Sequence, residues 1–348
     1  MKKIYLLIAL AFSYSFITKI QAQTYDDPVA YMQAIDNAYR EMNEKNMAYM
    51  SAAGHGRRAR KIEKLRIQTL QTIENTRNKL IDLPLYKGDN SYRKSSIDYA
   101  QFCYNIFNED YKKIVNLEDI AEQSVDEMQA YLLLQEETNK KYKEATAIIN
   151  QAEKDFAKKY NINLVEHKDE LGDKLEVATK LTHYANQVYI LFFKCNWEEN
   201  QLTQALNNKK ITQAEQARNA LITYANEGLQ LLNSDSLKDF QMDPALAQQC
   251  RIALTFYKKV GEKDVPKMLD YFLKRENFDK IKNSMDTKSN RTQQDVDTYN
   301  AAVREMNKGV DEFNQINQNL NSQKNQLVNN WEVTEKSFID AHMPYYKK

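Results

Sequence analysis

The clearest pattern in the chain lies toward its C-terminus, where apolar side chains recur at alternating spacings of three and four residues between positions 292 and 342. Such a seven-residue repeat places them along one edge of a helix and is typical of a left-handed coiled-coil seam. One unbroken helix over this range would measure roughly 75 Å at 1.5 Å per residue. The predicted seam consists of Val296, Tyr299, Val303, Met306, Val310, Phe313, Leu320, Leu327, Trp331, Phe338 and Ala341.

Polar residues interrupt this seam at Asn317, Lys324 and Thr334. Residues of this kind either fix the register of a helix against its neighbours or mark a stretch that its neighbours only partly cover. A buried polar binding pocket is the alternative interpretation.

Helical spacing of apolar residues continues through most of the chain. Pro28 suits the first turn of an early helix, and Pro84 predicts the end of the second. The spacing predicts helices over residues 28–53, 57–83, 91–115, 118–160, 169–206, 212–233, 244–261, 265–284 and 292–342.

Composition supports a fold of few, long elements. The 348 residues include only 7 Gly and 5 Pro, which argues against β-sandwiches, barrels and propellers with their many tight turns. We therefore expect an all-α fold of up-and-down bundles of long helices with coiled-coil seams.

The helical pattern also suggests an internal duplication. A shift of 171 residues superposes the apolar seam of helix 118–160 on that of the last helix, so that Val125 matches Val296. A smaller offset matches Val29 with Val177 and Phe102 with Phe256. We expect two units of four long helices each, the first over residues 24–163 and the second over residues 164–348.

The first 23 residues have the pattern of a secretory signal peptide. Lys2 and Lys3 precede an apolar stretch over residues 4–17, and Ala22 offers a small-residue cleavage site. The stretch is short for a membrane span, and no cysteine follows it as a lipid anchor. We expect an exported protein, periplasmic or at the cell surface, without a membrane span after removal of this segment.

Charge adds little to this picture. The chain has 49 Lys and Arg against 48 Asp and Glu, and removal of the first 23 residues leaves a net charge of about −2. A near-neutral protein is a poor partner for nucleic acid or for an anionic membrane surface. The basic stretch over residues 57–61 is interpreted as a solvated helix start.

Cys103, Cys195 and Cys250 each lie among apolar neighbours. We expect buried free thiols, with a Cys195–Cys250 disulfide as the alternative in an oxidising compartment. The sequence contains no CxxC motif.

Motifs that carry chemistry are missing from the sequence. The four histidines form no HExxH or ExxH pattern, and there is no glycine-rich phosphate loop and no GxSxG motif. We therefore predict no catalytic residue, no metal ligand and no cofactor, and a protein that is not an enzyme.

Two aromatic groups are the candidate contact residues. Tyr99 and Phe102 lie on a predicted helix whose aromatic residues cannot all share one face. Phe192 and Phe193 end an apolar run that Trp197 follows, and a helix that is apolar all round is either buried or meets a partner. A core role is the simpler interpretation of all five, and a ligand or partner contact is the alternative.

The last helix and the residues after it carry a resemblance to known proteins. The segments that carry it are Tyr299-Asn300, Phe313-Asn314, Asn329-Asn330-Trp331, Lys336-Ser337-Phe338 and His342-Met343-Pro344. They are similar to the end of an uncharacterised family of secreted, all-helical surface proteins of leptospires and Bacteroidetes. The resemblance implies an envelope or surface location and an unassigned function, and it transfers no catalytic residue.

The leading hypothesis is an exported envelope or surface protein that acts as a non-enzymatic scaffold or interaction module. Its partner would be an envelope or surface protein of unknown identity, and the long seams leave its oligomeric state open. The alternative is a periplasmic binding protein that holds a small ligand in an apolar pocket between helices.

Overall fold

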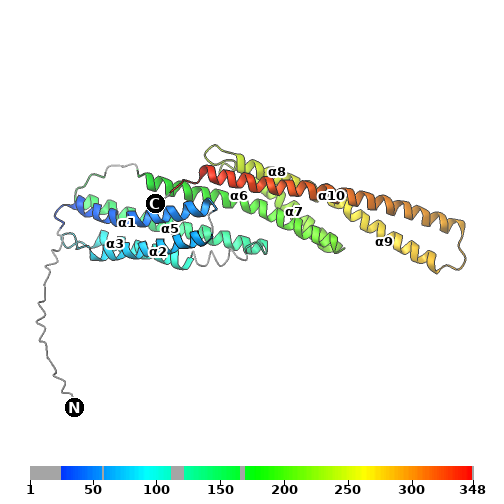
Figure 1. Cartoon of the computed structure of the whole chain (residues 1–348), viewed down its shortest axis with the longest axis horizontal. Coiled ribbons are helices and arrows are strands. Elements are labelled where there is room, and N and C mark those ends of the chain that lie inside the picture. The colour runs from blue at the N-terminus through cyan, green and yellow to red at the C-terminus, as the bar shows by residue number, and fades with distance from the viewer. Residues whose placement is uncertain (1–24, 57–58, 111–120, 165–168, 347–348) are drawn as a thin grey trace, which may run out of the picture.

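The computed structural model describes residues 25–56, 59–110, 121–164 and 169–346, and most of these residues lie in helices (Figure 1). Within these ranges the only β pairings are two isolated bridges, Tyr86 with Asp89 and Phe240 with Asp243. The all-α prediction is therefore confirmed. The predicted signal peptide, residues 1–23, lies outside the described ranges.

The described residues of the first half of the chain pack as four long helices. Asp27 caps the first of them by accepting hydrogen bonds from the backbone N–H groups of Val29 and Ala30, at 3.0 and 3.3 Å. Consecutive helices contact each other, so that the chain runs up and down. The helices are α1 (Pro28–Gly54), α2 (Ala59–Asp82), α3 (Ser91–Asn105) and α5 (Val125–Lys159), and a π-helical turn, η1 (Ile106–Asp110), follows α3.

The described residues of the second half form a bundle with one extra helix. Helices α6, α7 and α8 contact one another, α10 contacts α6 and α8, and α9 lies against the outer part of α10. Lys209 lies in the turn between α6 and α7 and has the left-handed backbone conformation, with φ 56°. The helices are α6 (Glu170–Asn207), α7 (Ile211–Leu231), α8 (Ala245–Lys259), α9 (Val265–Thr287) and α10 (Gln293–His342).

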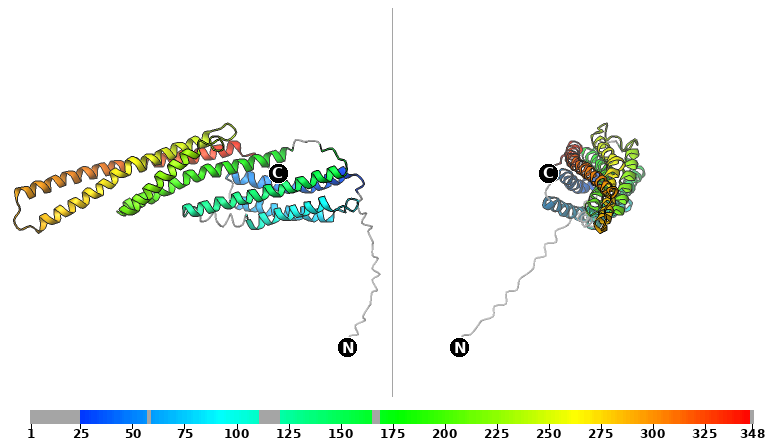
Figure 2. Two further views of the ribbon diagram at one scale, coloured as in Figure 1. Left: turned by 180° about the vertical axis from the view of Figure 1, so that it is seen from behind. Right: turned by 90° about the vertical axis from the view of Figure 1, so that its right-hand side faces the viewer.

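The two bundles follow each other along the long axis of an elongated molecule (Figures 1 and 2). They meet where α6 contacts α1 and α5. The C-terminal end of α10 returns to α1, so the last described residues lie against the first bundle (Figure 1). None of the helices described combines the length and hydropathy that crossing a bilayer requires.

The first half differs from the prediction in two details. The helix expected over 91–115 is α-helical to Asn105 and continues as the π-helical turn η1 to Asp110, and its predicted end at residue 115 lies outside the described ranges. The next helix begins at Val125 rather than at residue 118, because the Ser124 hydroxyl caps it by accepting a hydrogen bond from the N–H of Glu127 at 3.1 Å.

Helices α8 and α9 form one continuous helical path instead of two separate helices. A π-helical turn, η2 (Val260–Asp264), connects them without a loop. Pro266 follows this turn and has no N–H to donate to the carbonyl four residues earlier. Widening of the helix just before a proline accommodates that missing bond.

Helix α10 is one unbroken helix of 50 residues, as the heptad pattern predicts. It begins with a capping box in which the Thr292 and Asp295 side chains each accept from the other residue's backbone N–H. Of the predicted seam residues, Leu327, Trp331 and Phe338 are buried, and all three lie in the C-terminal half of the helix. In the N-terminal half α9 alone covers the seam, so most apolar seam residues there stay half-exposed.

Candidate interaction surfaces

Tyr99 and Phe102, two of the predicted contact residues, lie on α3 inside the first bundle. The Tyr99 ring meets that of Tyr39 edge-on at 5.6 Å, and its hydroxyl lies 3.3 Å from the Thr146 hydroxyl. Burial raises the pKa of Tyr99 well above its usual range. Phe102 packs half-buried against the cluster that contains Cys103. Both residues therefore contribute to packing between helices.

Phe192, Phe193 and Trp197 divide between two other clusters. The Phe192 ring lies flat on that of Trp331, with centroids 4.2 Å apart and an interplanar angle of 4°, which joins α6 to α10. Phe193 and Trp197, 6.2 Å apart, pack instead against the N-terminal end of α5 where the bundles meet. The five predicted contact residues thus belong to separate packed clusters and do not share a pocket.

An aromatic cluster with an aspartate closes one end of the first bundle. Tyr31, Tyr86 and Phe156 contact one another with centroids 5.3 to 5.7 Å apart, and Tyr160 contacts Tyr86 and Phe156 at 4.8 and 4.7 Å. The Tyr160 hydroxyl donates to Asp89 at 3.1 Å. Burial would raise the pKa of Asp89, but hydrogen bonds from neighbouring groups hold it well below its usual value.

The second bundle contains a cluster with the same set of contacts. Tyr184, Phe240 and Phe338 contact one another with centroids 5.5 to 6.2 Å apart, and His342 contacts Phe240 and Phe338 at 5.4 and 4.6 Å. His342 Nε2 lies 2.8 Å from the Asp243 carboxylate. This hydrogen bond is the main reason that the pKa of Asp243 is lowered. His342 thus occupies the place that Tyr160 occupies in the first bundle.

The C-terminal tail fastens the second bundle to the end of α1. His55 Nδ1 lies 3.0 Å from Asp340, and the His55 ring stacks on Tyr345 at 3.8 Å. The N–H of Tyr346 donates to the Ser51 hydroxyl at 3.1 Å. Gly54 leaves room for Met343, because a Cβ there would lie 2.6 Å from the methionine side chain. This face of α1 is therefore a built interface.

A buried ion pair connects α6 and α10. Lys324, one of the polar residues of the predicted seam, pairs with Glu199, whose side chain is 7 % exposed. Lys324 also donates to Asn200 at 2.5 Å, and Thr203 donates to Glu199 at 2.9 Å. The pair fixes the register of α10 against α6, because a shift of α10 would leave a buried carboxylate without its cation.

A polar groove opens on the outer side of the α6–α7 hairpin, with a volume of about 580 Å³. Ala205, Ala217 and Ala220 form its floor. Among the described residues, none of the polar side chains along its walls has a hydrogen-bond or ion-pair partner. Burial raises the pKa of Glu198 at one end. The polar walls of this α6–α7 groove consist of Glu198, Gln201, Gln204, Asn208, Lys210, Gln213 and Gln216.

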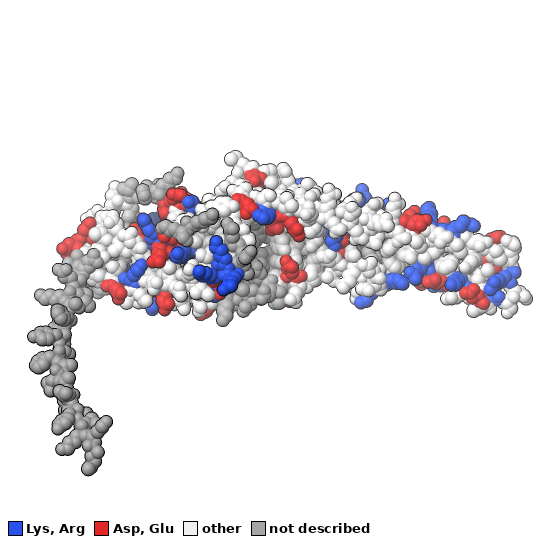
Figure 3. All heavy atoms as spheres, viewed as in Figure 1, with Lys and Arg blue, Asp and Glu red and all other residues white. Residues whose placement is uncertain are grey.

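Helices α9 and α10 form a two-helix arm that extends beyond α7 (Figure 1). Phe313 holds its base together through contacts with Tyr271 and Phe272, at 4.9 and 5.6 Å. Farther out, Phe278 contacts Tyr299 at 5.9 Å. Basic and acidic side chains alternate over the arm's outer end (Figure 3). The arm is thus a narrow projection with a half-covered apolar seam and a mixed-charge surface.

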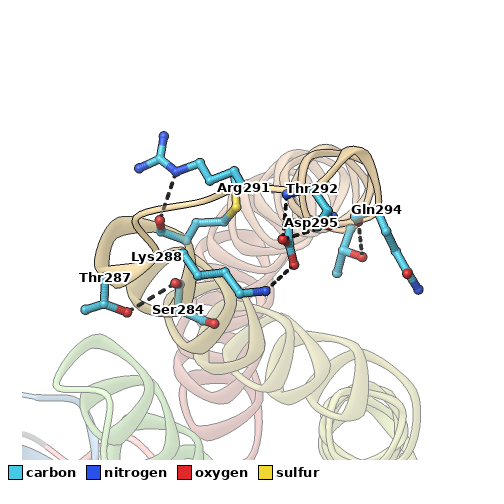
Figure 4. Close-up of polar contacts among 9 residues, drawn as sticks. Ser284, Thr287, Lys288, Arg291, Thr292, Gln294 and Asp295 are labelled. Carbon is cyan, nitrogen blue, oxygen red and sulfur yellow. Dashed lines mark hydrogen bonds and ion pairs between the residues drawn. The ribbon is translucent and has the colours of Figure 1, made fainter.

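Polar contacts fix the turn at the end of the arm (Figure 4). Lys288 pairs with Asp295 at 2.6 Å, and Arg291 donates to the Met285 carbonyl at 3.1 Å. The hydrogen bond from Lys288, with further bonds from Thr292, lowers the pKa of Asp295 to about 2. The turn between the helices is therefore ordered rather than a loose loop.

The described cysteines are buried in the packing, and the described histidines make polar contacts. All three cysteines are buried and free, so the Cys195–Cys250 disulfide considered as an alternative is not formed. His183 Nδ1 lies 2.6 Å from Glu136 and joins α6 to α5, while His167 lies outside the described residues. In the part of the chain that the structure describes, no three His, Cys, Asp or Glu side chains converge as a metal site would require.

Comparison with known proteins identifies no relative. No protein-family model, no curated protein and no solved structure matches this chain. The resemblance to secreted surface proteins therefore stays an expectation.

Proposed function

We propose that the protein is an exported, non-enzymatic scaffold or interaction module of the cell envelope or cell surface. The observation that carries this proposal is the α9–α10 arm, which projects beyond the rest of the second bundle. In this arm only α9 covers the apolar seam of α10. A two-helix hairpin leaves much of its apolar seam accessible, and such a seam suits docking of a partner's helix. The histidine and buried lysine contacts between helices support a structural use of these groups.

Shortening the arm tests this proposal. Replacing residues 276–303 by a short Gly/Ser turn removes the outer arm and keeps its base, Phe313 included. In the source cells, chemical cross-linking followed by mass spectrometry should identify an envelope protein bound to the full-length chain and lose it with the shortened chain. Unchanged cross-links would contradict an arm-based contact, and substrate turnover by the purified protein would contradict a non-enzymatic role.

We also propose that the two bundles are repeats of one ancestral unit. The matching aromatic clusters support this, because Tyr31 and Tyr184 hold the same place in each. The π-helical turns match as well. Arg66 of α2 donates to the Phe107 carbonyl in η1 at 2.9 Å, and Arg218 of α7 donates to the Gly261 carbonyl in η2 at 2.7 Å.

At the last helix, the contacts support a different register of the proposed repeat. If Phe156 and Phe338 are equivalent, the shift is 182 residues rather than the 171 that the heptads suggest. Heptad patterns superpose on one another at several shifts because their apolar spacing is similar. The α9 segment and the longer α10 account for the greater length of the second unit.

A swap at one position tests the repeat. If His342 and Tyr160 are equivalent, His342→Tyr should keep the stability of the second bundle, because tyrosine can donate to Asp243 as Tyr160 donates to Asp89. His342→Ala should lower the free energy of unfolding by about 1–3 kcal/mol, since it removes a ring and a hydrogen bond. Equal losses from both variants would contradict the equivalence.

Small-ligand binding is the second proposal, and it would have to use the polar α6–α7 groove rather than an apolar pocket. Native mass spectrometry of protein purified from its source tests it, since a tightly held ligand adds to the mass. A bare mass would argue against it.

A further inference from the structure

The proposed repeat relates a covered face of α1 to an open face of α6. Tyr31 and Tyr184 are 153 positions apart, and the same shift relates the buried polar residues Asn46 and Glu199. It makes Ser51 equivalent to Gln204. Continued along the helix, the shift relates Ala48, Ala52 and His55 to Gln201, Ala205 and Asn208, all of which line the α6–α7 groove.

The first unit shows what covers this face. The C-terminal tail of the second unit lies over α1, with Met343 against Gly54 and the Tyr346 N–H bonded to Ser51. Ala48 and Ala52, next to these contacts on α1, are buried, at 6 % and 8 % exposure.

The equivalent face of α6 has no such cover among the described residues, and its amide side chains have no partners. Gln204 and Asn208 on the α6 wall of the groove are thus the open counterparts of Ser51 and His55, which the tail contacts on α1. The α2 positions equivalent to the α7 wall, such as Glu63 and Lys64, are exposed.

The segment equivalent to the tail is also exposed. The shift of 182 residues that relates Phe156 to Phe338 relates Met343, Tyr345 and Tyr346 to Asn161, Asn163 and Leu164. All three are exposed, and Leu164, an apolar residue, is 43 % exposed. One molecule therefore has both halves of the interface, at different places on its surface.

We propose that the α6–α7 groove binds residues 161–164 of a second copy of this chain, so that the copies associate head to tail. This rests on the repeat proposed above. Glutamine and asparagine side chains both donate and accept hydrogen bonds, so they can pair with the carbonyl groups of this segment and with the N–H groups of Asn163 and Leu164. The N–H groups of Asn161 and Ile162 already bond to the carbonyls of Lys158 and Ala157. The alanine floor lets that backbone approach closely. A contact between two different surfaces does not close on itself in general and extends into a linear assembly.

Site-directed cross-linking tests this contact. Gln204→Cys lies on the groove wall and Asn163→Cys lies in the exposed segment, and neither replaces a buried side chain. The native thiols are buried and should not compete. With a short bis-maleimide, a mixture of the two variants should give a cross-linked dimer containing one chain of each. A chain carrying both substitutions should give a ladder of higher oligomers.

Control variants decide the result. Val333→Cys lies on α10 at an exposed position outside the groove and should give only background cross-linking. Ala220→Trp fills the half-exposed end of the floor and should abolish the Gln204–Asn163 cross-link. Dimers of Gln204→Cys with itself, or a mixed dimer no more abundant than the Val333→Cys background, would overturn head-to-tail binding.

The head-to-tail contact can be absent even where the proposed scaffold function of the arm is correct. The chain with the shortened arm keeps the groove and the 161–164 segment, so it should form the same cross-links while losing its envelope partner. If His342→Tyr and His342→Ala are equally destabilising, the repeat on which the contact rests fails instead.

Discussion

Replacing Lys324 by methionine should lower the free energy of unfolding of the second bundle by about 3–5 kcal/mol. Lys324 is 18 % exposed and Glu199 is 7 % exposed, so the pair is largely shielded from water. Methionine fills much the same space but leaves the Glu199 carboxylate without its cation. The loss is therefore mainly the penalty of an unpaired buried charge rather than lost packing.

Urea unfolding followed by tryptophan fluorescence measures this loss. Trp197 on α6 and Trp331 on α10 are the only tryptophans in the chain, so the signal reports on the second bundle. Lys336→Met is the matched control, because Lys336 is 74 % exposed and pairs with Asp340 on the surface of the same helix. Its effect should stay below about 1 kcal/mol.

A double variant separates the pair from general damage. Glu199→Met combined with Lys324→Met removes both charges and should recover most of the stability that Lys324→Met loses, since apolar residues of similar volume replace a buried pair at little cost. The interpretation would be refuted if Lys324→Met lost no more stability than Lys336→Met. It would also be refuted if the losses of the two single substitutions simply added in the double variant.

Three further outcomes are expected. Trp331→Ala should lower the free energy of unfolding, followed by circular dichroism, by about 3–5 kcal/mol, because Trp331 is 2 % exposed and stacks on Phe192. The control Val333→Ala should change it by less than about 0.5 kcal/mol. The pKa of Asp89 is lower in the folded protein than in the unfolded chain. The stability that ionised Asp89 gives the folded protein is therefore complete above about pH 4 and is lost as the pH falls further. Asp89→Asn should accordingly weaken the acid dependence of Tm. The three thiols, whose pKa values burial raises, should react with a thiol reagent at pH 8 only after unfolding.

Local sequence signals predicted the helices well where they act within one turn. Pro28 with Asp27 indicated the start of α1. The heptad pattern over α10, which no proline or glycine pair interrupts, predicted one continuous helix. The π-helical turn before Pro266 was missed, because apolar spacing alone does not distinguish a widened turn from a break between two helices. The end of α3 at Asn105 was missed for the same reason.

The interaction surfaces were less predictable than the helices. Lys324 was identified as a polar residue of the seam, but its partner Glu199 lies 125 positions earlier and becomes evident only when α6 and α10 pack together. The aromatic residues taken as contact candidates fill separate clusters, since a helix apolar all round is explained by burial on several sides. The glutamines of the α6–α7 groove look in sequence like any solvated face, and only the pairing of the helices places them around one hollow.

The contact between His55 and Asp340 spans 285 positions of the chain, so it can form only after the chain has been synthesised as far as Asp340. The four helices of the first bundle are made first and have short-range partners, and such units fold before the rest of a growing chain. The end of α1 therefore stays uncovered until residues 340–346 have been synthesised. Loss of residues 343–346 should leave both bundles folded but joined only through α6 and the His55–Asp340 contact.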